Sequence, residues 1–352
     1  TGHTESVGAV AVFTAVDGTP RVVTGSGDGV VRIWNPTTRT QEARLTGHTE
    51  SVGAVAVFTA VDGTPRVVTG SGDGVVRIWN PTTRTQEARL TGHTESVSAV
   101  AVFTGWDGTP RVVTGSYDGT VRIWNPTTRT QEHKLRRRVR VRWVSAVAVF
   151  TAADGTPRVV AGSDDGVVRI WNPATRIQEA QLTSRKGRLK ELAVFTAVDG
   201  TPRVVTGSHD GTVRIWNPTT RTQEAELTGH TGWVSAVAVF TAVDGTPRVV
   251  TGGHDGTVRI WNPTTRTQET QLTGHTGWVS AVTVFTARDG TRHLAIGQID
   301  EKVLRICNLR TRTVRTLPLQ QRVFALQEQN GLLFAGGSSG YLAIDISSMP
   351  SD

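Results

Sequence analysis

The sequence predicts an all-β protein in which small four-stranded sheets repeat around a ring. Three observations support this prediction. Residues 1–45 are identical to residues 46–90, which reveals an internal repeat. The stretch SGDGVVRIWNP at 26–36 occurs six times, four of them with small changes, at a spacing of 45 to 47 residues. Each copy also contains four short apolar or alternating runs separated by turn residues, which is typical of all-β repeat folds.

The first copy predicts where these four strands lie. VGAVAVF (7–13) is almost unbroken apolar sequence, which suits a strand buried on both faces. RVVTGS (21–26) and VVRIWN (30–35) are joined by a Gly-Asp-Gly turn, in which glycine supplies the positive φ of a tight hairpin. After the turn residues NPTT, TQEARL (40–45) alternates as a half-exposed outer strand does. We therefore expect burial to fall from the first strand to the fourth, and we expect the sheets to stack because one alone cannot cover its faces.

Each sheet forms one blade of the ring, and the count of blades depends on two diverged copies. The seventh copy reads LRICN, with Cys307 in the tryptophan position, and the eighth, LFAGGSSGYLAIDI at 333–346, has Asp345 there. We expect one β-propeller domain over 1–352 with eight four-stranded blades; the alternative is a seven-bladed ring with a loose eighth unit. Only seven copies of the outer strand are present, so blade eight either has three strands here or takes a fourth from upstream. The expected repeats are 1–45, 46–90, 91–135, 136–182, 183–227, 228–272, 273–317 and 318–348.

The repeat resembles the WD40 family along nearly the whole chain. Gly2 and His3 before the first strand, Asp28 in the hairpin and Trp34 at the end of the third strand carry the resemblance, although the closing dipeptide is Trp-Asn and not Trp-Asp. The resemblance implies a propeller in which a histidine, a threonine, an aspartate and a tryptophan form a structural hydrogen-bonded chain, so that the His–Asp pairs are not catalytic. The implied members are His3, Thr24, Asp28, Trp34, His48, Thr69, Asp73, Trp79, His93, Thr114, Asp118, Trp124, His230, Thr251, Asp255 and Trp261. Blades four, five, seven and eight lack members, and we expect them to be less rigid.

The differences between copies gather at two positions that we expect on one face, around the mouth of the central channel. The hairpin residue before the aspartate is Gly27, Gly72, Tyr117, Asp164, His209, His254 or Ile299. The residue before the first strand is Ser6, Ser51, Ser96, Trp143, Arg188, Trp233 or Trp278. We call these two sets the variable rim. Because exposed aromatic residues are enriched at interface hot spots, we predict protein binding by Trp143, Trp233, Trp278, Tyr117, His209 and His254. The alternative is drift after duplication, with the tryptophans only capping the blades.

A cluster of basic residues is predicted beside this rim. RRRVRVR (136–142) and SRKGRLK (184–190) occupy the same loop of blades four and five. The predicted anion-binding residues are Arg136, Arg137, Arg138, Arg140, Arg142, Arg185, Lys186, Arg188 and Lys190. An acidic protein segment, a phosphate group and a nucleic-acid backbone are the candidate ligands, and a solvated loop without a ligand is the alternative. Nucleic acid is disfavoured because Trp143 is the one aromatic residue interleaved to stack on bases.

Composition and motifs bound the function. The formal net charge of +8 favours an acidic partner, and a single cysteine excludes an internal disulfide framework. The sequence has no CxxC, HExxH, phosphate-loop or G-x-S-x-G motif, so we predict no enzyme activity, cofactor or metal. The pairs His209-Asp210 and His254-Asp255 are only a weak basis for a surface metal site. No apolar run is long enough to span a bilayer.

The predicted function is that of a non-catalytic interaction scaffold or sensor that is monomeric and cytoplasmic. Near-identical repeats and arginine in place of lysine resemble WD40 arrays of GC-rich bacteria, in which the propeller often follows a signalling ATPase, protease or kinase region. Because the first residue is Thr1, we expect the C-terminal part of a larger signalling protein. A polyanion- or phosphate-binding module that uses the basic loops is the alternative function.

Overall fold

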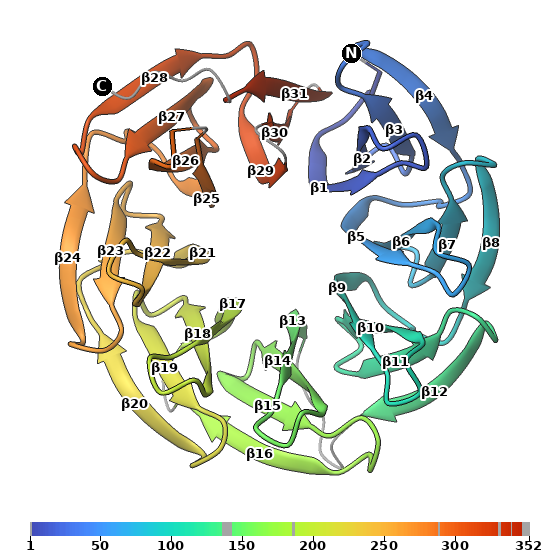
Figure 1. Cartoon of the computed structure of the whole chain (residues 1–352), viewed down its shortest axis with the longest axis horizontal. Coiled ribbons are helices and arrows are strands. Elements are labelled where there is room, and N and C mark those ends of the chain that lie inside the picture. Colours follow the sequence, from blue (N-terminus) through green and yellow to red (C-terminus); the bar gives the residue numbers. More distant parts are fainter. Residues whose placement is uncertain are drawn as a thin grey trace.

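The computed structural model describes residues 2–135, 143–184, 187–287, 289–329, 332–338 and 340–346. Within these ranges the chain forms 31 strands in eight antiparallel sheets and contains no helix. The sheets stand side by side in a ring (Figure 1). The fold is therefore an eight-bladed β-propeller, and the seven-bladed alternative is wrong because β29–β31 occupy a blade position of their own between the seventh blade and the first.

The four strands of a blade follow one another outward from the centre of the ring (Figure 1). The innermost strands are β1 (Val7–Thr14), β5 (Val52–Thr59), β9 (Val97–Thr104), β13 (Val144–Thr151), β17 (Leu189–Thr196), β21 (Val234–Thr241), β25 (Val279–Thr286) and β29 (Val323–Gln329). The second strands are β2 (Pro20–Ser26), β6 (Pro65–Ser71), β10 (Pro110–Ser116), β14 (Pro157–Ser163), β18 (Pro202–Ser208), β22 (Pro247–Gly253), β26 (Arg292–Gln298) and β30 (Leu332–Gly337).

The third and fourth strands complete each blade on its outer side. The third strands are β3 (Val31–Asn35), β7 (Val76–Asn80), β11 (Val121–Asn125), β15 (Val167–Trp171), β19 (Val213–Asn217), β23 (Val258–Asn262), β27 (Val303–Asn308) and β31 (Gly340–Asp345). The outermost strands are β4 (Thr40–Leu45), β8 (Thr85–Leu90), β12 (Thr130–Leu135), β16 (Gln178–Thr183), β20 (Thr222–Leu227), β24 (Thr267–Leu272) and β28 (Val314–Pro318). Blade eight has three strands in the described part of the chain, so the expectation of four strands holds for the other seven.

Turn residues explain the hairpins of a blade. In the turn between β2 and β3, Gly29 has a φ of 71°, and the Asp28 carboxylate accepts a hydrogen bond from the amide of Val30 at 3.0 Å. In the turn before β4, Asn35 Oδ1 accepts from the amides of Thr37 and Thr38 at 3.0 and 3.1 Å. Because the chain reverses at every turn, the β2–β3 hairpins lie at one end of the blades and the β1–β2 and β3–β4 turns lie at the other.

The predicted fall in burial from the first strand to the fourth is wrong. The second and third strands are buried almost throughout, whereas the middle of β1, Val10–Val12, is only half-buried. The reason is the ring itself, because the innermost strands border its centre and are covered by neighbouring blades on their flanks (Figure 1). The outermost strands alternate between exposed and buried residues, as expected.

The hydrophobic core lies between blades. Phe13 and Ile33 of blade one pack with Val52, Val67 and Trp79 of blade two, and equivalent clusters recur around the ring. Since each tryptophan contacts the preceding blade, a blade cannot bury its apolar face alone.

Blade eight closes the ring on blade one by side-chain packing. Val22, Trp34 and Phe334 form a buried cluster, and the rings of Trp34 and Tyr341 lie 4.7 Å apart. The described residues include no helix that is long and apolar enough to cross a membrane.

Candidate interaction site

Four blades contain the hydrogen-bonded chain that the resemblance implied. In blade two, His48 lies between Asp73 and Thr69, with Nδ1 2.9 Å from the carboxylate and Nε2 2.8 Å from the hydroxyl. Trp79 Nε1 donates to the same hydroxyl at 2.9 Å. The structure brings together the equivalent residues of blades one, three and six, namely His3, Thr24, Asp28, Trp34, His93, Thr114, Asp118, Trp124, His230, Thr251, Asp255 and Trp261.

In blade two, the chemistry of the partners of His48 determines which of its ring nitrogens carries the proton. The Asp73 carboxylate only accepts, so Nδ1 of His48 carries the proton and Nε2 accepts from Thr69. Burial lowers the pKa of His48, which keeps the ring neutral. Burial raises the pKa of Asp73, but hydrogen bonds from His48, Val75 and Thr49 outweigh this effect and hold it below its usual value. Both ring nitrogens are thus engaged within the blade, and this arrangement supports a structural role.

Three of the blades that lack the full chain hold their hairpins with arginine. In blade four Asp165 binds Arg169 at 2.6 Å, and in blade five Asp210 binds Arg214 at 2.9 Å. In blade seven Asp300 occupies the aspartate position, but the next residue, Glu301, binds Arg305 at 2.6 Å. Blade one has the full chain and also the equivalent ion pair, between Arg32 and Asp28 at 2.9 Å, so the pair is not specific to the incomplete blades. The expected difference in rigidity stays a prediction.

The two positions of the variable rim meet across blade boundaries. The hairpin residue of one blade contacts the residue before the first strand of the next blade. Tyr117 stacks on Trp143 with ring centroids 5.0 Å apart, and Asp164 forms an ion pair with Arg188 at 3.3 Å. The sequence analysis missed this pairing. The sequence does contain a signal, because an aromatic hairpin residue is matched by an aromatic residue in the next blade, and the acidic hairpin residue is matched by a basic one.

The rings form a continuous row over blades five to seven. His209 stacks on Trp233 at 4.0 Å and 2°, Trp233 contacts His254 at 5.0 Å, and His254 stacks on Trp278 at 4.2 Å and 8°. We call these four residues the aromatic row. Burial, followed by nearby cations, lowers the pKa of both histidines, so neutral rings stack. Trp233 and Trp278 remain 48% and 47% exposed, so the row presents apolar surface to solvent.

The predicted basic cluster lies largely outside the described residues. This applies to Arg136, Arg137, Arg138, Arg140, Arg142, Arg185 and Lys186. The two members that are described differ: Arg188 is engaged by Asp164, whereas Lys190 is an exposed residue of β17.

Comparison with known proteins identifies the repeat. The family model described as WD40, "WD domain, G-beta repeat", matches residues 1–35, 39–80, 84–125, 138–172, 193–217 and 221–262, which is more than half of the chain. The chain belongs to the WD40 family. Among solved structures, this WD40 propeller is similar to the computationally designed protein Ika8, with a TM-score of 0.80, 26% identity and 98% of each chain covered. No protein with a curated description matches the sequence.

The described part of this WD40 propeller holds no group of three metal-ligating side chains. Asp210 is engaged by Arg214, and Asp255 by His230 and by the amide of Thr231, so neither is poised beside its neighbouring histidine as a ligand. Burial raises the pKa of the Cys307 thiol to about 11, which keeps the sulfur protonated and a poor nucleophile.

Glu191 is a half-buried acid of the propeller that the sequence analysis missed. It lies on β17, in a position that is alanine in the other blades, such as Ala146 and Ala236. Burial raises the pKa of its carboxyl to about 7, and the amide of Leu192 donates to it at 3.2 Å. The signal in the sequence was a single acid within an otherwise apolar strand.

Glu191→Ala should stabilise the propeller more at alkaline than at acidic pH. Because the pKa is about 7 in the folded chain and 4.5 as a free side chain, the contribution of Glu191 is fully present below pH 4.5 and is lost as pH rises through 7. Since the side chain is partly exposed, we expect the variant to gain about 2 kcal/mol at pH 8.5 and little at pH 4.5. Urea unfolding at both pH values, with Glu191→Gln as the neutral isostere, tests this. An equal gain at both pH values would contradict it.

Proposed function

We propose that this WD40 propeller is a non-catalytic interaction module that binds a protein or peptide on the variable rim. The observation that carries the proposal is the aromatic row, because stacked rings with half of each tryptophan exposed form a rigid apolar surface. Tryptophan in a preorganised position loses little conformational entropy on binding, which is why it dominates interface hot spots. Trp143 and Tyr117, which are 53% and 40% exposed, extend the same type of surface to blades three and four.

The cellular setting belongs to the same proposal. We infer that the propeller works as a monomer in the cytoplasm, as the C-terminal part of a larger bacterial signalling protein. Near-identical repeats and the preference for arginine support this setting.

Trp233→Ala should abolish most of the binding without unfolding the propeller. We would select binders from a random peptide library on the immobilised full chain and measure the affinities of the selected peptides. Loss of Trp233, which contacts both histidines of the row, should weaken binding about 30-fold, as for a hot-spot residue worth about 2 kcal/mol. The matched control is Trp106→Ala, because Trp106 is 55% exposed but lies in a β9–β10 turn on the opposite face.

Stability and salt dependence separate the alternatives. If Trp233→Ala lowers the melting temperature as much as Trp261→Ala, the tryptophans of the rim only cap the blades. If binding falls steeply with ionic strength and the affinity is unchanged in Trp233→Ala, the basic loops and not the aromatic row hold the ligand.

A further inference from the structure

Six blades carry the same ion triad on the face opposite the variable rim. In blade six, Arg248 of β22 binds Asp244 at 2.9 Å and Glu269 of β24 at 2.7 Å. The other five triads are centred on Arg21, Arg66, Arg111, Arg158 and Arg203. Each guanidinium is neutralised by two carboxylates, so these arginines are structural.

Blade seven has lost this triad. His293 stands in the arginine position of β26 and stacks on Phe285 with ring centroids 5.3 Å apart. The sequence of β28, VRTLP, contains no glutamate. Asp289, which is left without the arginine, accepts from the amide and hydroxyl of Thr291 at 2.9 and 2.6 Å.

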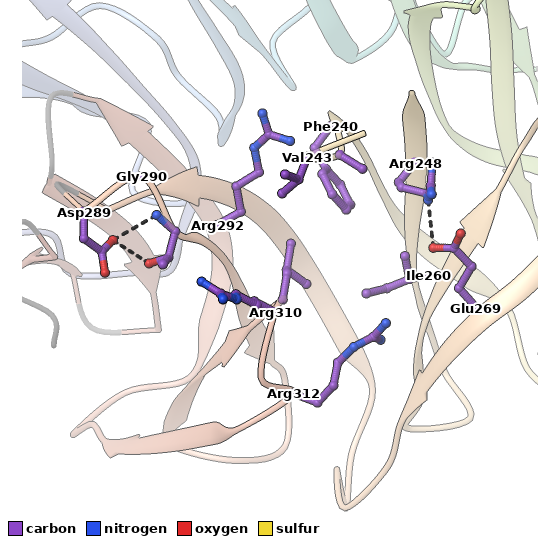
Figure 2. Close-up of a pocket in the computed structure, with 13 residues that line it drawn as sticks. Phe240, Val243, Arg248, Ile260, Glu269, Asp289, Gly290, Arg292, Arg310 and Arg312 are labelled. Carbon is purple, nitrogen blue, oxygen red and sulfur yellow. Dashed lines mark hydrogen bonds and ion pairs between the residues drawn. The ribbon is translucent and has the colours of Figure 1, made fainter. Parts of the chain in front are cut away.

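New arginines appear in the same place. Arg292 replaces the proline found at Pro247 of blade six, and Arg310 replaces Thr264. Together with Arg312, they line a pocket of about 690 Å³ between blades six and seven. Figure 2 shows these arginines across from the Arg248–Glu269 pair. The apolar residues of the pocket are Phe240, Ala242, Val243, Ile260 and Leu309.

The equivalent pocket between blades two and three shows what has changed. It measures about 310 Å³, and its Arg66 is engaged by Asp62 and Glu87. Arg129 and Thr127 stand there in the positions of Arg312 and Arg310. Divergence of blade seven has therefore doubled the pocket and added two positive charges to it.

The added charges have no carboxylate partner within the described ranges. No ion pair joins Arg292, Arg310 or Arg312 to an acid there, and Nη1 of Arg292 is buried without a hydrogen-bond acceptor. Arginines that line a pocket without a carboxylate partner leave their charge available to an oxyanion. Guanidinium groups also match the planar, two-oxygen geometry of carboxylates and phosphates.

We propose that this pocket binds a small organic phosphate or carboxylate with an apolar body. The arginines that line the pocket supply the positive charge that attracts the oxyanion, and Phe240, Val243 and Ile260 contact the apolar part. The volume lies within the range of about 300 to 1,000 Å³ of small-ligand sites, which favours a small molecule over a protein segment. The site is independent of the variable rim, because it lies on the opposite face.

Calorimetric titration of the full chain with 1-naphthyl phosphate tests the proposal, with 1-naphthol and inorganic phosphate as partial ligands. We expect 1-naphthyl phosphate to bind more tightly than either partial ligand. Arg310→Gln, and Arg292→Pro, which restores the residue of blade six, should each weaken binding about tenfold, as expected for loss of a charge-assisted hydrogen bond. Arg129→Gln is the matched control in the smaller pocket and should leave the affinity unchanged.

The other outcomes overturn the proposal. One is the absence of binding at millimolar 1-naphthyl phosphate. The second is an affinity that is unchanged in the Arg292 and Arg310 variants, and the third is an equal loss of affinity in Arg129→Gln. The fourth is binding of inorganic phosphate as tight as that of 1-naphthyl phosphate. Binding of a hexaglutamate peptide in place of 1-naphthyl phosphate would assign the pocket to an acidic protein segment. Circular dichroism of each variant confirms that the propeller is folded before titration.

Discussion

Thr69→Val should lower the free energy of unfolding by about 4 kcal/mol, although the two side chains have nearly the same volume. The Thr69 hydroxyl is fully buried, accepts from Trp79 Nε1 at 2.9 Å and donates to His48 Nε2 at 2.8 Å. Valine leaves both nitrogens buried without a partner, and each such loss costs about 1–3 kcal/mol. Urea unfolding of the full chain at pH 7 measures the change.

Thr206→Val in blade five is the matched control for this prediction. Thr206 accepts from Trp216 Nε1 at 3.0 Å, but the preceding loop, TSRKGR, contains no histidine. Only one buried donor loses its partner, so the loss should be about half as large. Equal losses in the two variants would show that the histidine adds nothing to the chain, and the structural reading of the His–Asp pairs would then fail.

The blades were predictable because their pattern is local and repeated. Strand boundaries, hairpins and the order of strands all follow from neighbouring residues such as the GDG and NPTT turns. The burial of the innermost strands was not predictable in the same way, because it depends on how closely these strands approach one another at the centre of the ring. The almost unbroken apolar sequence of β1 predicts a fully buried strand, and yet the middle of the strand is only half-buried.

Contacts between copies were the part of the site that sequence reasoning missed. The stacking of Tyr117 on Trp143 joins residues of different blades, so it depends on how the ring places neighbouring loops. The pairs do leave a signal, because Asp164 and Arg188 change together and with opposite charge. The pocket beside Arg310 left a signal too, since copy seven lacks the arginine and glutamate of the triads. Both signals become visible only when the sequences of the copies are compared with one another.

The spacing of the blades depends on a glycine that every copy retains. It lies in the second strand of all eight blades, as Gly25, Gly70, Gly115, Gly162, Gly207, Gly252, Gly297 and Gly336. At Gly115, a Cβ would lie 2.6 Å from Val144 Cγ1 and 2.9 Å from Val147 Cγ1 of the next blade. Both distances are far below van der Waals contact, so glycine lets neighbouring blades approach closely.

Gly115→Ala should therefore cost about 3 kcal/mol, because the two valines are β-branched and cannot rotate away. Gly162→Ala is the matched control, since blade five presents Leu192 and Leu189 at 3.2 and 3.5 Å and the ends of leucine side chains can move. The control should cost less than about 1 kcal/mol, and part of that is offset by the lower backbone entropy of alanine in the unfolded chain.

Urea unfolding of both variants gives the comparison, and Leu189→Val in the Gly162→Ala background completes it, because Leu189 stands in the position of Val144. If branched side chains set the closest approach of blades, the added valine should turn the mild control into a variant about as unstable as Gly115→Ala. Equal costs at Gly115 and Gly162 without that change would mean that the backbone, and not the facing side chain, fixes the distance between blades. The leucines of blade five would then be incidental to its packing.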